Sequence, residues 1–292
     1  HDGDHVGDEP ADTLDETSSD TADSEIVGTC DGGELAKALA IVKPAIRVKD
    51  QPDLLLRSGG VLARRSSLLA FAPVPSLCLA RPTLVPVSHL FSRRRPVPDA
   101  STPVRVTPTG LQIGIATKPL IEKSVKHWHT VDEKVADSVV TAVVEADRLR
   151  AVLLYVMEVS FKDDWCADLA QVEVIEGALW VLYRSILATV RIPELAESRM
   201  QIGRQDIRPL RAWLRIAANQ AVTVREDDRM TVFVRQDGAY FCVARPLVRF
   251  PKLKVPEHTE GEGSTVVLVD RAEFKAVAEQ AGRDERVSLE VD

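Results

Sequence analysis

The sequence predicts an α+β fold assembled from repeated units, each made of one strand, one helix and three further strands. Three observations lead to this prediction. Residues 200–256 contain the clearest unit, residues 138–193 repeat its order of elements, and residues 24–75 repeat it in weaker form. A further copy begins near residue 264. Repetition of one supersecondary pattern along a chain indicates an architecture of similar structural modules.

Residues 1–23 are predicted to be a disordered acidic tail. Residues 1–25 carry ten acidic side chains and neither lysine nor arginine. Without them the formal net charge of the chain changes from −7 to −7 + 10 = +3. The segment has few large apolar groups, so it cannot bury enough surface to fold by itself. We interpret it as a solubilising tail, with a DNA-mimicking or autoinhibitory arm as the alternative.

Residues 24–133 form the first predicted domain. A helix is expected over 33–46, where Leu35, Leu39 and Val42 share one face, and Pro44 ends or bends it. A strand over 25–29 precedes this helix. Three short strands follow it, over 52–59, 60–67 and 68–74. The match to the repeated unit becomes poor after residue 76.

Residues 81–110 are predicted to be loop-like, because six prolines interrupt any regular element. These prolines are Pro82, Pro86, Pro96, Pro98, Pro103 and Pro108. We interpret the run Arg93-Arg94-Arg95 as a solvated charge run, with a basic loop near DNA as the alternative. A strand over 111–116 and a short helix over 118–128 are expected next, without a clear place in the repeat.

Residues 134–258 form the second predicted domain, which holds two complete units. The first unit has a helix over 146–160, and the second has a helix that starts near residue 206. The strands of the first unit are expected over 138–144, 169–177, 178–186 and 187–193. Those of the second are expected over 200–203, 221–227, 229–236 and 239–247. Asp237-Gly238 is a strong turn dipeptide between the last two strands.

The helix of the second unit carries two different stripes. Its apolar stripe consists of Ile207, Leu210, Leu214 and Ala217. A second stripe consists of Arg204, Arg208, Arg211 and Arg215. At 100° per residue the stripes lie about a third of a turn apart, so the helix can bury one and present the other. Pro209 is tolerable if Asp206 is the N-cap, because the proline then lies in the first turn.

A third domain is expected to begin after a linker at 257–264. It has a strand over 265–269, a helix over 270–282 and a strand over 286–292, so residues 264–292 are an incomplete copy. No apolar run is long enough to span a bilayer. Four scattered cysteines without CxxC spacing fit a reducing cytosol. The absence of a starting methionine and of a signal peptide favours a trimmed or partial sequence.

The order of elements in 200–256, ending in Arg249-Phe250-Pro251, resembles half a domain of the bacterial DNA polymerase processivity clamps, the DNA polymerase III beta subunits. The resemblance implies the DNA clamp fold, with helices on the inner face of a ring and sheets outside. It also implies a homodimeric, cytoplasmic, nucleoid-associated ring that is not an enzyme, needs no cofactor or metal, and does not contact a membrane.

The resemblance implies that cations on the inner helices face duplex DNA without sequence preference. Such contacts are salt-dependent and neutralise phosphates. The arginine stripe would supply the main contacts, because no acidic residue at i,i+4 neutralises it. Lesser contributors are expected at Lys37, Arg148, Arg150, Arg271 and Lys275. The alternative is an ordinary solvated helix face.

The family also binds short apolar peptides of polymerases and the clamp loader in a pocket between its second and third domains. Leu187 and Ala188 match the end of the family motif T-D-x-H-R-L-A, although residues 182–186 read LYRSI. Pro251 matches the proline of R-F-P, and Lys254 and Val255 match the basic–apolar pair beyond it. The departure at 182–186 favours altered partners or a relative that no longer serves the replicase.

Other chemistry is not supported by the residue patterns. His127 and His129 lack a third nearby metal ligand, and the carboxylates at 163–164 and 226–228 fall at expected turns, where we expect them to be solvated. No phosphate-binding, dinucleotide-binding or serine-hydrolase motif occurs. The chain is therefore predicted not to be an enzyme. Two alternatives remain: a clamp-fold interaction scaffold that does not encircle DNA, and a small-substrate enzyme in residues 76–137.

Overall fold

The computed structural model describes most of the chain up to residue 246. Its described residues are 28–46, 53–92, 95–99, 101–108, 110–121, 125, 128, 134–160, 172–183 and 186–246. The predicted acidic tail and the predicted start of a third domain lie outside these residues. The chain divides into two units, and the described residues all belong to the unit His1–Phe250. The domain boundaries predicted near residues 134 and 264 stay predictions.

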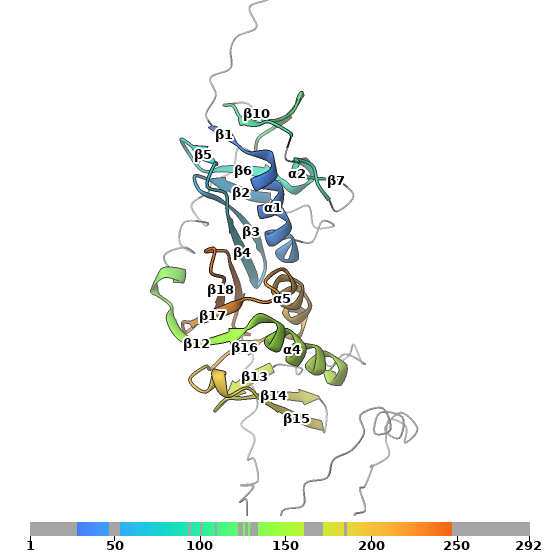
Figure 1. The fold of residues 1–292 in the computed structure, drawn as a ribbon, viewed down its shortest axis with the longest axis vertical. Coiled ribbons are helices and arrows are strands. Elements are labelled where there is room, and N and C mark those ends of the chain that lie inside the picture. The colour runs from blue at the N-terminus through green and yellow to red at the C-terminus, as the bar shows by residue number, and fades with distance from the viewer. Residues whose placement is uncertain are drawn as a thin grey trace, which may run out of the picture. The chain divides into compact units, whose positions relative to one another are not determined.

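One large antiparallel sheet dominates the described part (Figure 1). Its eight strands follow the order β12-β17-β18-β19-β4-β3-β2-β6. They are β12 (Val139–Glu145), β17 (Ala221–Glu226), β18 (Met230–Val234), β19 (Tyr240–Ala244), β4 (Leu68–Pro73), β3 (Gly60–Arg65), β2 (Asp53–Arg57) and β6 (Thr83–Pro86). At its centre β19 pairs with β4, with Tyr240 opposite Phe71. This pair joins residues from the two predicted domains into one sheet.

Two smaller sheets and a short hairpin complete the strands. The five-stranded sheet has the order β11-β10-β9-β1-β5, with β1 (Gly28–Cys30), β5 (Cys78–Leu79), β9 (Val104–Val106), β10 (Gly110–Ile113) and β11 (Ala116–Pro119). The four-stranded sheet has the order β15-β14-β13-β16, with β13 (Val172–Ile175), β14 (Ala178–Tyr183), β15 (Ile186–Arg191) and β16 (Gln201–Ile202). The hairpin consists of β7 (Phe91–Ser92) and β8 (Arg95–Pro96).

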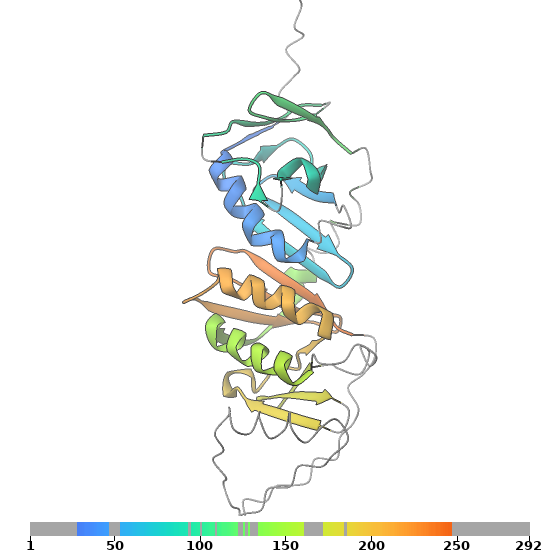
Figure 2. The same ribbon diagram turned by 90° about the vertical axis from the view of Figure 1, so that its right-hand side faces the viewer.

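Three long helices lie on the same side of these sheets (Figure 2). They are α1 (Gly32–Val42), α4 (Ala146–Ser160) and α5 (Arg204–Ile216). A four-residue helix, α2 (Val87–Leu90), and the 3-10 helices η1 (Lys43–Ala45) and η3 (Pro193–Leu195) are short connectors. No helix within the described ranges is long and apolar enough to cross a membrane.

The two units of the second half interlock through their first strands. The unit β12–α4–β13–β14–β15 places β12 beside β17 of the other unit. The unit β16–α5–β17–β18–β19 in turn places β16 beside β13. β12 therefore extends the three strands β17, β18 and β19 of the other unit, and β16 extends the three strands β13, β14 and β15. This exchange explains why the repeated sequence pattern produces a compact pair of units.

The first half repeats this exchange, which corrects the loop expected at 81–110. β1 pairs with β9, and β6 pairs with β2, in the same way as β12 with β17 and β16 with β13. The second unit is therefore β6–α2–β9–β10–β11, with a helix of only four residues. The expected helix over 118–128 is wrong at its start, because Lys118 and Pro119 belong to β11. Its middle falls largely outside the described residues.

The main core lies between the helices and the sheets. Leu35, Leu39 and Val42 of α1 are fully buried, as the helical spacing predicts. In α5, Trp213 packs on Phe241 of β19 with ring centroids 5.7 Å apart. Each buried side chain of this size contributes about 1.5–3 kcal/mol through removal from water. This apolar contact fixes which face of α5 is turned away from the sheet.

A second apolar cluster lies on the opposite face of the eight-stranded sheet. Leu55, Leu62 and Leu69 alternate with residues of the main core along their strands. Val125 and Trp128, from the segment that joins the two halves, pack against this cluster. The connecting segment therefore covers part of the sheet face that the helices leave open.

The prediction that Asp206 caps α5 is wrong. The helix begins at Arg204 with Gly203 as its N-cap, and Pro209 lies inside it. The buried Asp206 side chain instead accepts a hydrogen bond from the Ser67 hydroxyl, at 2.7 Å. Ser67 lies in the turn between β3 and β4, so a contact distant in sequence determines the role of this carboxylate. Burial raises the pKa of Asp206 above its usual value, while the Ser67 hydrogen bond opposes the shift.

Candidate nucleic-acid interface

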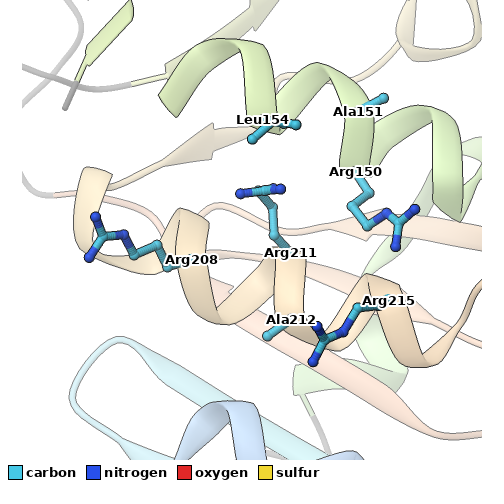
Figure 3. Close-up of a pocket in the computed structure, with 7 residues that line it drawn as sticks. All are labelled: Arg150, Ala151, Leu154, Arg208, Arg211, Ala212 and Arg215. Atoms are coloured by element: carbon cyan, nitrogen blue, oxygen red, sulfur yellow. The ribbon is translucent and has the colours of Figure 1, made fainter. Parts of the chain in front are cut away.

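Four arginines from two neighbouring helices line one open groove (Figure 3). α4 contributes Arg150, and α5 contributes Arg208, Arg211 and Arg215. The groove has a volume of about 370 Å³. Its apolar lining is formed by Ala151, Leu154 and Ala212. Within the described part of the chain, four guanidinium groups and no carboxylate are among the residues that line it. We call it the arginine groove.

Helical spacing explains why these residues share one surface. Residues 208, 211, 212 and 215 are separated by three, one and three positions, which places them on one face of α5. Residues 150, 151 and 154 similarly lie on the face of α4 that meets this groove. Ile207, Leu210 and Leu214 are buried on the other side of α5. The apolar stripe therefore anchors α5 and leaves the arginines at the helix–helix boundary.

The arginines differ in their surroundings. Arg208 and Arg215 are exposed. Arg211 is half-buried and reaches α4, where its Nη1 lies 3.0 Å from the sulfur of Met157. Figure 3 shows Arg211 pointing toward Leu154 of α4. The groove therefore has exposed cations towards the two ends of α5 and a half-buried guanidinium between them.

Asp147 positions the fourth arginine and links the two helices. Its Oδ1 forms an ion pair with Nη2 of Arg150, at a distance of 3.0 Å. Its Oδ2 accepts a hydrogen bond from the Asn219 backbone N–H at 2.8 Å. Asn219 follows α5 and has a positive φ of 61°. This carboxylate therefore connects the start of α4 to the end of α5. Sequence analysis missed it, although its i,i+3 spacing to Arg150 is a recognisable signal.

The other predicted DNA-facing residues do not join this groove. Arg148 forms an ion pair with Glu194 of η3. Arg204 is half-buried at the start of α5 and does not line the groove. Lys37 is exposed on α1 and lines a separate groove. Arg271 and Lys275 lie outside the described residues. The structure therefore brings together Arg150, Arg208, Arg211 and Arg215 from the predicted set.

The predicted peptide pocket lies mostly outside the described residues. Leu187 and Ala188 belong to β15, where they pair with Leu182 and Val181 of β14. Their side chains are not among those described, and Pro251, Lys254 and Val255 fall beyond residue 246. The pocket therefore stays a prediction.

Glu226 is buried, contrary to the solvated turn expected for residues 226–228. It ends β17, and its carboxylate accepts hydrogen bonds from the Ser198 hydroxyl and from the Arg199 backbone N–H, the latter at 3.0 Å. Arg245 forms an ion pair with the same carboxylate at 3.1 Å. Glu226 thus has a structural role, in which it joins three segments of the second half.

Metal and thiol chemistry have little support in the described part of the chain. His127, His129 and the carboxylates at 163–164 lie outside it, and within it no group of three or more potential metal ligands occurs. Cys30, Cys78 and Cys242 are free thiols. Burial, together with the nearby carboxylates of Asp31 and Glu34, raises the pKa of Cys30 to about 12. This thiol is therefore protonated and unreactive at neutral pH.

Solved structures of sliding clamps have the same fold as this chain. The DNA polymerase III beta subunit of Thermotoga maritima is 18% identical, with a TM-score of 0.57, over 78% of this chain and 67% of that protein. The corresponding protein of Pseudomonas aeruginosa is 16% identical, with a TM-score of 0.62, over 86% and 72%. The sliding clamp of Caulobacter crescentus is 15% identical, with a TM-score of 0.56, over 76% and 65%.

These comparisons identify the chain as a divergent protein of the clamp fold. The predicted α+β class and the predicted resemblance to bacterial clamps are confirmed at the level of fold. The chain aligns with about two thirds of the length of the solved clamps. No family model matches the sequence, and no curated protein matches it.

Proposed function

We propose that this chain is a non-catalytic sliding clamp subunit that encircles duplex DNA and contacts its phosphates through the arginine groove. The observation that carries the proposal is the convergence of Arg150, Arg208, Arg211 and Arg215 on one helical surface of a clamp-fold protein. Guanidinium groups suit this task because they stay charged and bind phosphate oxygens in a bidentate way. The surface offers cations without a base-reading element, so the binding is independent of sequence.

The strand pairing between β4 and β19 supports assembly into a larger ring. β4 is the last strand of a first unit, and β19 is the last strand of a second unit. β15 and β11 are the corresponding last strands, and each ends its sheet within the described residues. An edge strand offers unpaired backbone groups to another strand. The same junction, repeated at β15 and β11, extends the assembly at both ends and closes a homodimeric ring that includes the predicted third domain.

The proposed clamp tethers a DNA polymerase or another factor through a short apolar peptide. Leu187 and Ala188 on β15, with Pro251, Lys254 and Val255, are the residues we assign to that pocket. The sequence at 182–186 differs from the family motif, so the partner peptide differs from the usual one. Processivity on DNA then results from topology, because a closed ring slides without tight contacts.

The groove can be tested by the salt dependence of duplex binding. We expect the double variant Arg208→Ala, Arg215→Ala to bind a labelled 30-base-pair duplex more weakly than the native chain. The slope of log K against log salt should fall by about 2, roughly one for each phosphate that the variant no longer neutralises. Fluorescence anisotropy at several salt concentrations measures both quantities.

Arg148→Ala is the matched control, because Arg148 lies on α4 but pairs with Glu194 outside the groove. It should keep the native affinity and slope. If the double variant retained the native slope, the arginine groove would not be the DNA contact. Absence of duplex binding in the native chain would mean that the arginine groove makes no tight contact by itself, and the comparison of circular with linear DNA would then distinguish the clamp from the clamp-fold scaffold that does not encircle DNA.

A further inference from the structure

The arginine groove and the N-terminal segment of the chain carry opposite charges. Four guanidinium groups and no carboxylate are among the described residues that line the groove. Residues 1–25 carry ten acidic side chains and neither lysine nor arginine. Opposite charges on two surfaces favour their encounter and their correct pairing. The chain therefore contains, in one molecule, a cationic groove and a polyanion that complements it.

The cations of the groove are accessible along α5 (Figure 3). Arg208 and Arg215 are exposed, and their seven-residue separation corresponds to about 10 Å along the helix axis. In the segment, Glu9, Asp12 and Asp15 recur at every third residue. Carboxylates with this spacing are about 10 Å apart in an extended chain. Two successive members of this series can therefore reach both exposed guanidinium groups.

The apolar lining of the groove suits the single leucine of the segment. Leu154 of α4 is exposed and lines the groove together with Ala151 and Ala212. Leu14 lies between Asp12 and Asp15. Contact between Leu14 and Leu154 removes apolar surface from water, and this contribution is not screened by salt. The segment therefore offers carboxylates for the arginines and an apolar side chain for the surface between them.

We propose that residues 1–25 bind the arginine groove of the same chain and compete there with DNA phosphates. The competition rests on the proposed function, because it requires that DNA binds the same arginines. The contact between the segment and the groove rests on charge complementarity alone. A second groove, beside α1, lacks this complementarity, because Glu34 and Asp237 line it together with Lys37 and Arg235.

The chain is long enough for this contact within one copy. α1 and then η1 follow β1, which begins at Gly28, and η1 contacts α5. At 1.5 Å per residue, α1 is about 16 Å long and α5 about 20 Å long. Along this indirect path the arginine groove lies within about 60 Å of Gly28. The residues from Glu9 to Gly28 can extend over about 65 Å, so the acidic series reaches the groove.

The covalent connection allows weak ion pairs to hold the segment in place. Ion pairs between exposed side chains are individually weak and sensitive to salt. A short flexible linker raises the effective concentration of the segment at the groove to the order of 1 mM. Duplex DNA, which presents more phosphates than the segment has carboxylates, can still displace it. The segment therefore acts as a competitor that DNA must remove.

Binding of the segment in trans tests the contact. The host is the full chain with the ten acidic residues of 1–25 changed to Asn or Gln, so that its own segment no longer competes. The probe is a fluorescein-labelled synthetic peptide of residues 1–25, and anisotropy at low salt measures its affinity. We expect saturable binding, about fivefold weaker when the host also carries Arg208→Ala and Arg215→Ala. The native chain should bind the peptide at least about threefold more weakly than the host, because its own segment occupies the groove.

Arg64→Ala combined with Arg81→Ala is the matched control. It also removes two exposed guanidinium groups, but neither of them lines the arginine groove. The host with these two changes should bind the peptide within about twofold of the unaltered host. An unlabelled 30-base-pair duplex should release the peptide from the unaltered host, because both ligands use the same arginines.

The outcomes distinguish failure of this proposal from failure of the proposed function. Equal peptide affinity in the groove variant and in the control variant, or in the native chain and the host, would overturn the proposal. Lack of peptide binding in a host that binds duplex DNA through the groove would overturn it too, and would leave the proposed function intact. Groove-dependent peptide binding that the duplex does not reverse would support the contact and overturn the competition with DNA.

Discussion

At the scale of single residues, buried carboxylates hold distant segments of this fold together. Asp206 of α5 accepts from Ser67 of the first half, and Glu226 joins Ser198, Arg199 and Arg245 of the second half. Removing one partner from such a contact leaves the other buried and unsatisfied. These carboxylates therefore determine how the repeated units fit one another.

Asp206→Asn should change how stability depends on pH. The folded-state pKa of Asp206 is raised above 3.8 mainly by burial, so the folded state favours the protonated form. The stability contributed by this group is fully present below pH 3.8 and is lost as the pH rises through the raised pKa. Because the variant cannot ionise, its stability relative to the native chain should increase between pH 4 and pH 7, as measured by urea unfolding. A difference in stability between Asp206→Asn and the native chain that stays constant over this pH range would contradict the account.

Residue identities in the arginine groove could be predicted, but their grouping depended on the fold. The stripe on α5 followed from spacing alone. Arg148 and Arg150 differ by two positions, about 200° around a helix, so only one of them can face a given neighbour. Which one does so depends on the packing of α4 against α5. The burial of Asp206 likewise depends on Ser67, which lies 139 residues away and gives no local signal.

At the scale of elements, the long helices could be predicted from their apolar periodicity, and the short helix α2 could not. The expected helix over 146–160 is confirmed at both ends by α4. α2 has only four residues, too few for a helical period to be visible. Its neighbouring prolines made a loop the reasonable prediction, although Pro86 and Pro96 are accommodated at the ends of short strands. Pairing with β2, a tertiary contact, turns residues 83–86 into a strand.

Pro209→Ala should stabilise the protein. Pro209 lies inside α5, where it has no N–H to donate to the carbonyl of Gln205. Restoring this donor and removing the ring clash should raise the free energy of unfolding by about 1 kcal/mol or more, by urea unfolding. Gln205→Ala, at an exposed position of the same helix, should change it by less than about 0.5 kcal/mol. Destabilisation by Pro209→Ala would contradict this account.

At the scale of the whole molecule, one junction explains the proposed assembly. The β4–β19 pair continues a sheet from one half into the other, and the interlocked first strands make each half self-contained. Repetition of this junction around a ring places all helices on the same side, where the arginine groove would meet DNA. Two copies of this 292-residue sequence have a combined mass of about 2 × 32.1 = 64.2 kDa.

The most direct test of encirclement is retention on closed circular DNA compared with the same DNA after linearisation. The labelled full chain is loaded on a nicked circular plasmid, transferred to moderate salt, and followed by gel filtration before and after a single restriction cut. We expect retention on the circle and rapid loss from the linear ends, because a ring held by topology slides off an open end. Equal retention on both forms would contradict the clamp and leave only electrostatic binding through the arginine groove, and equal loss from both would contradict the clamp and leave no stable binding to DNA.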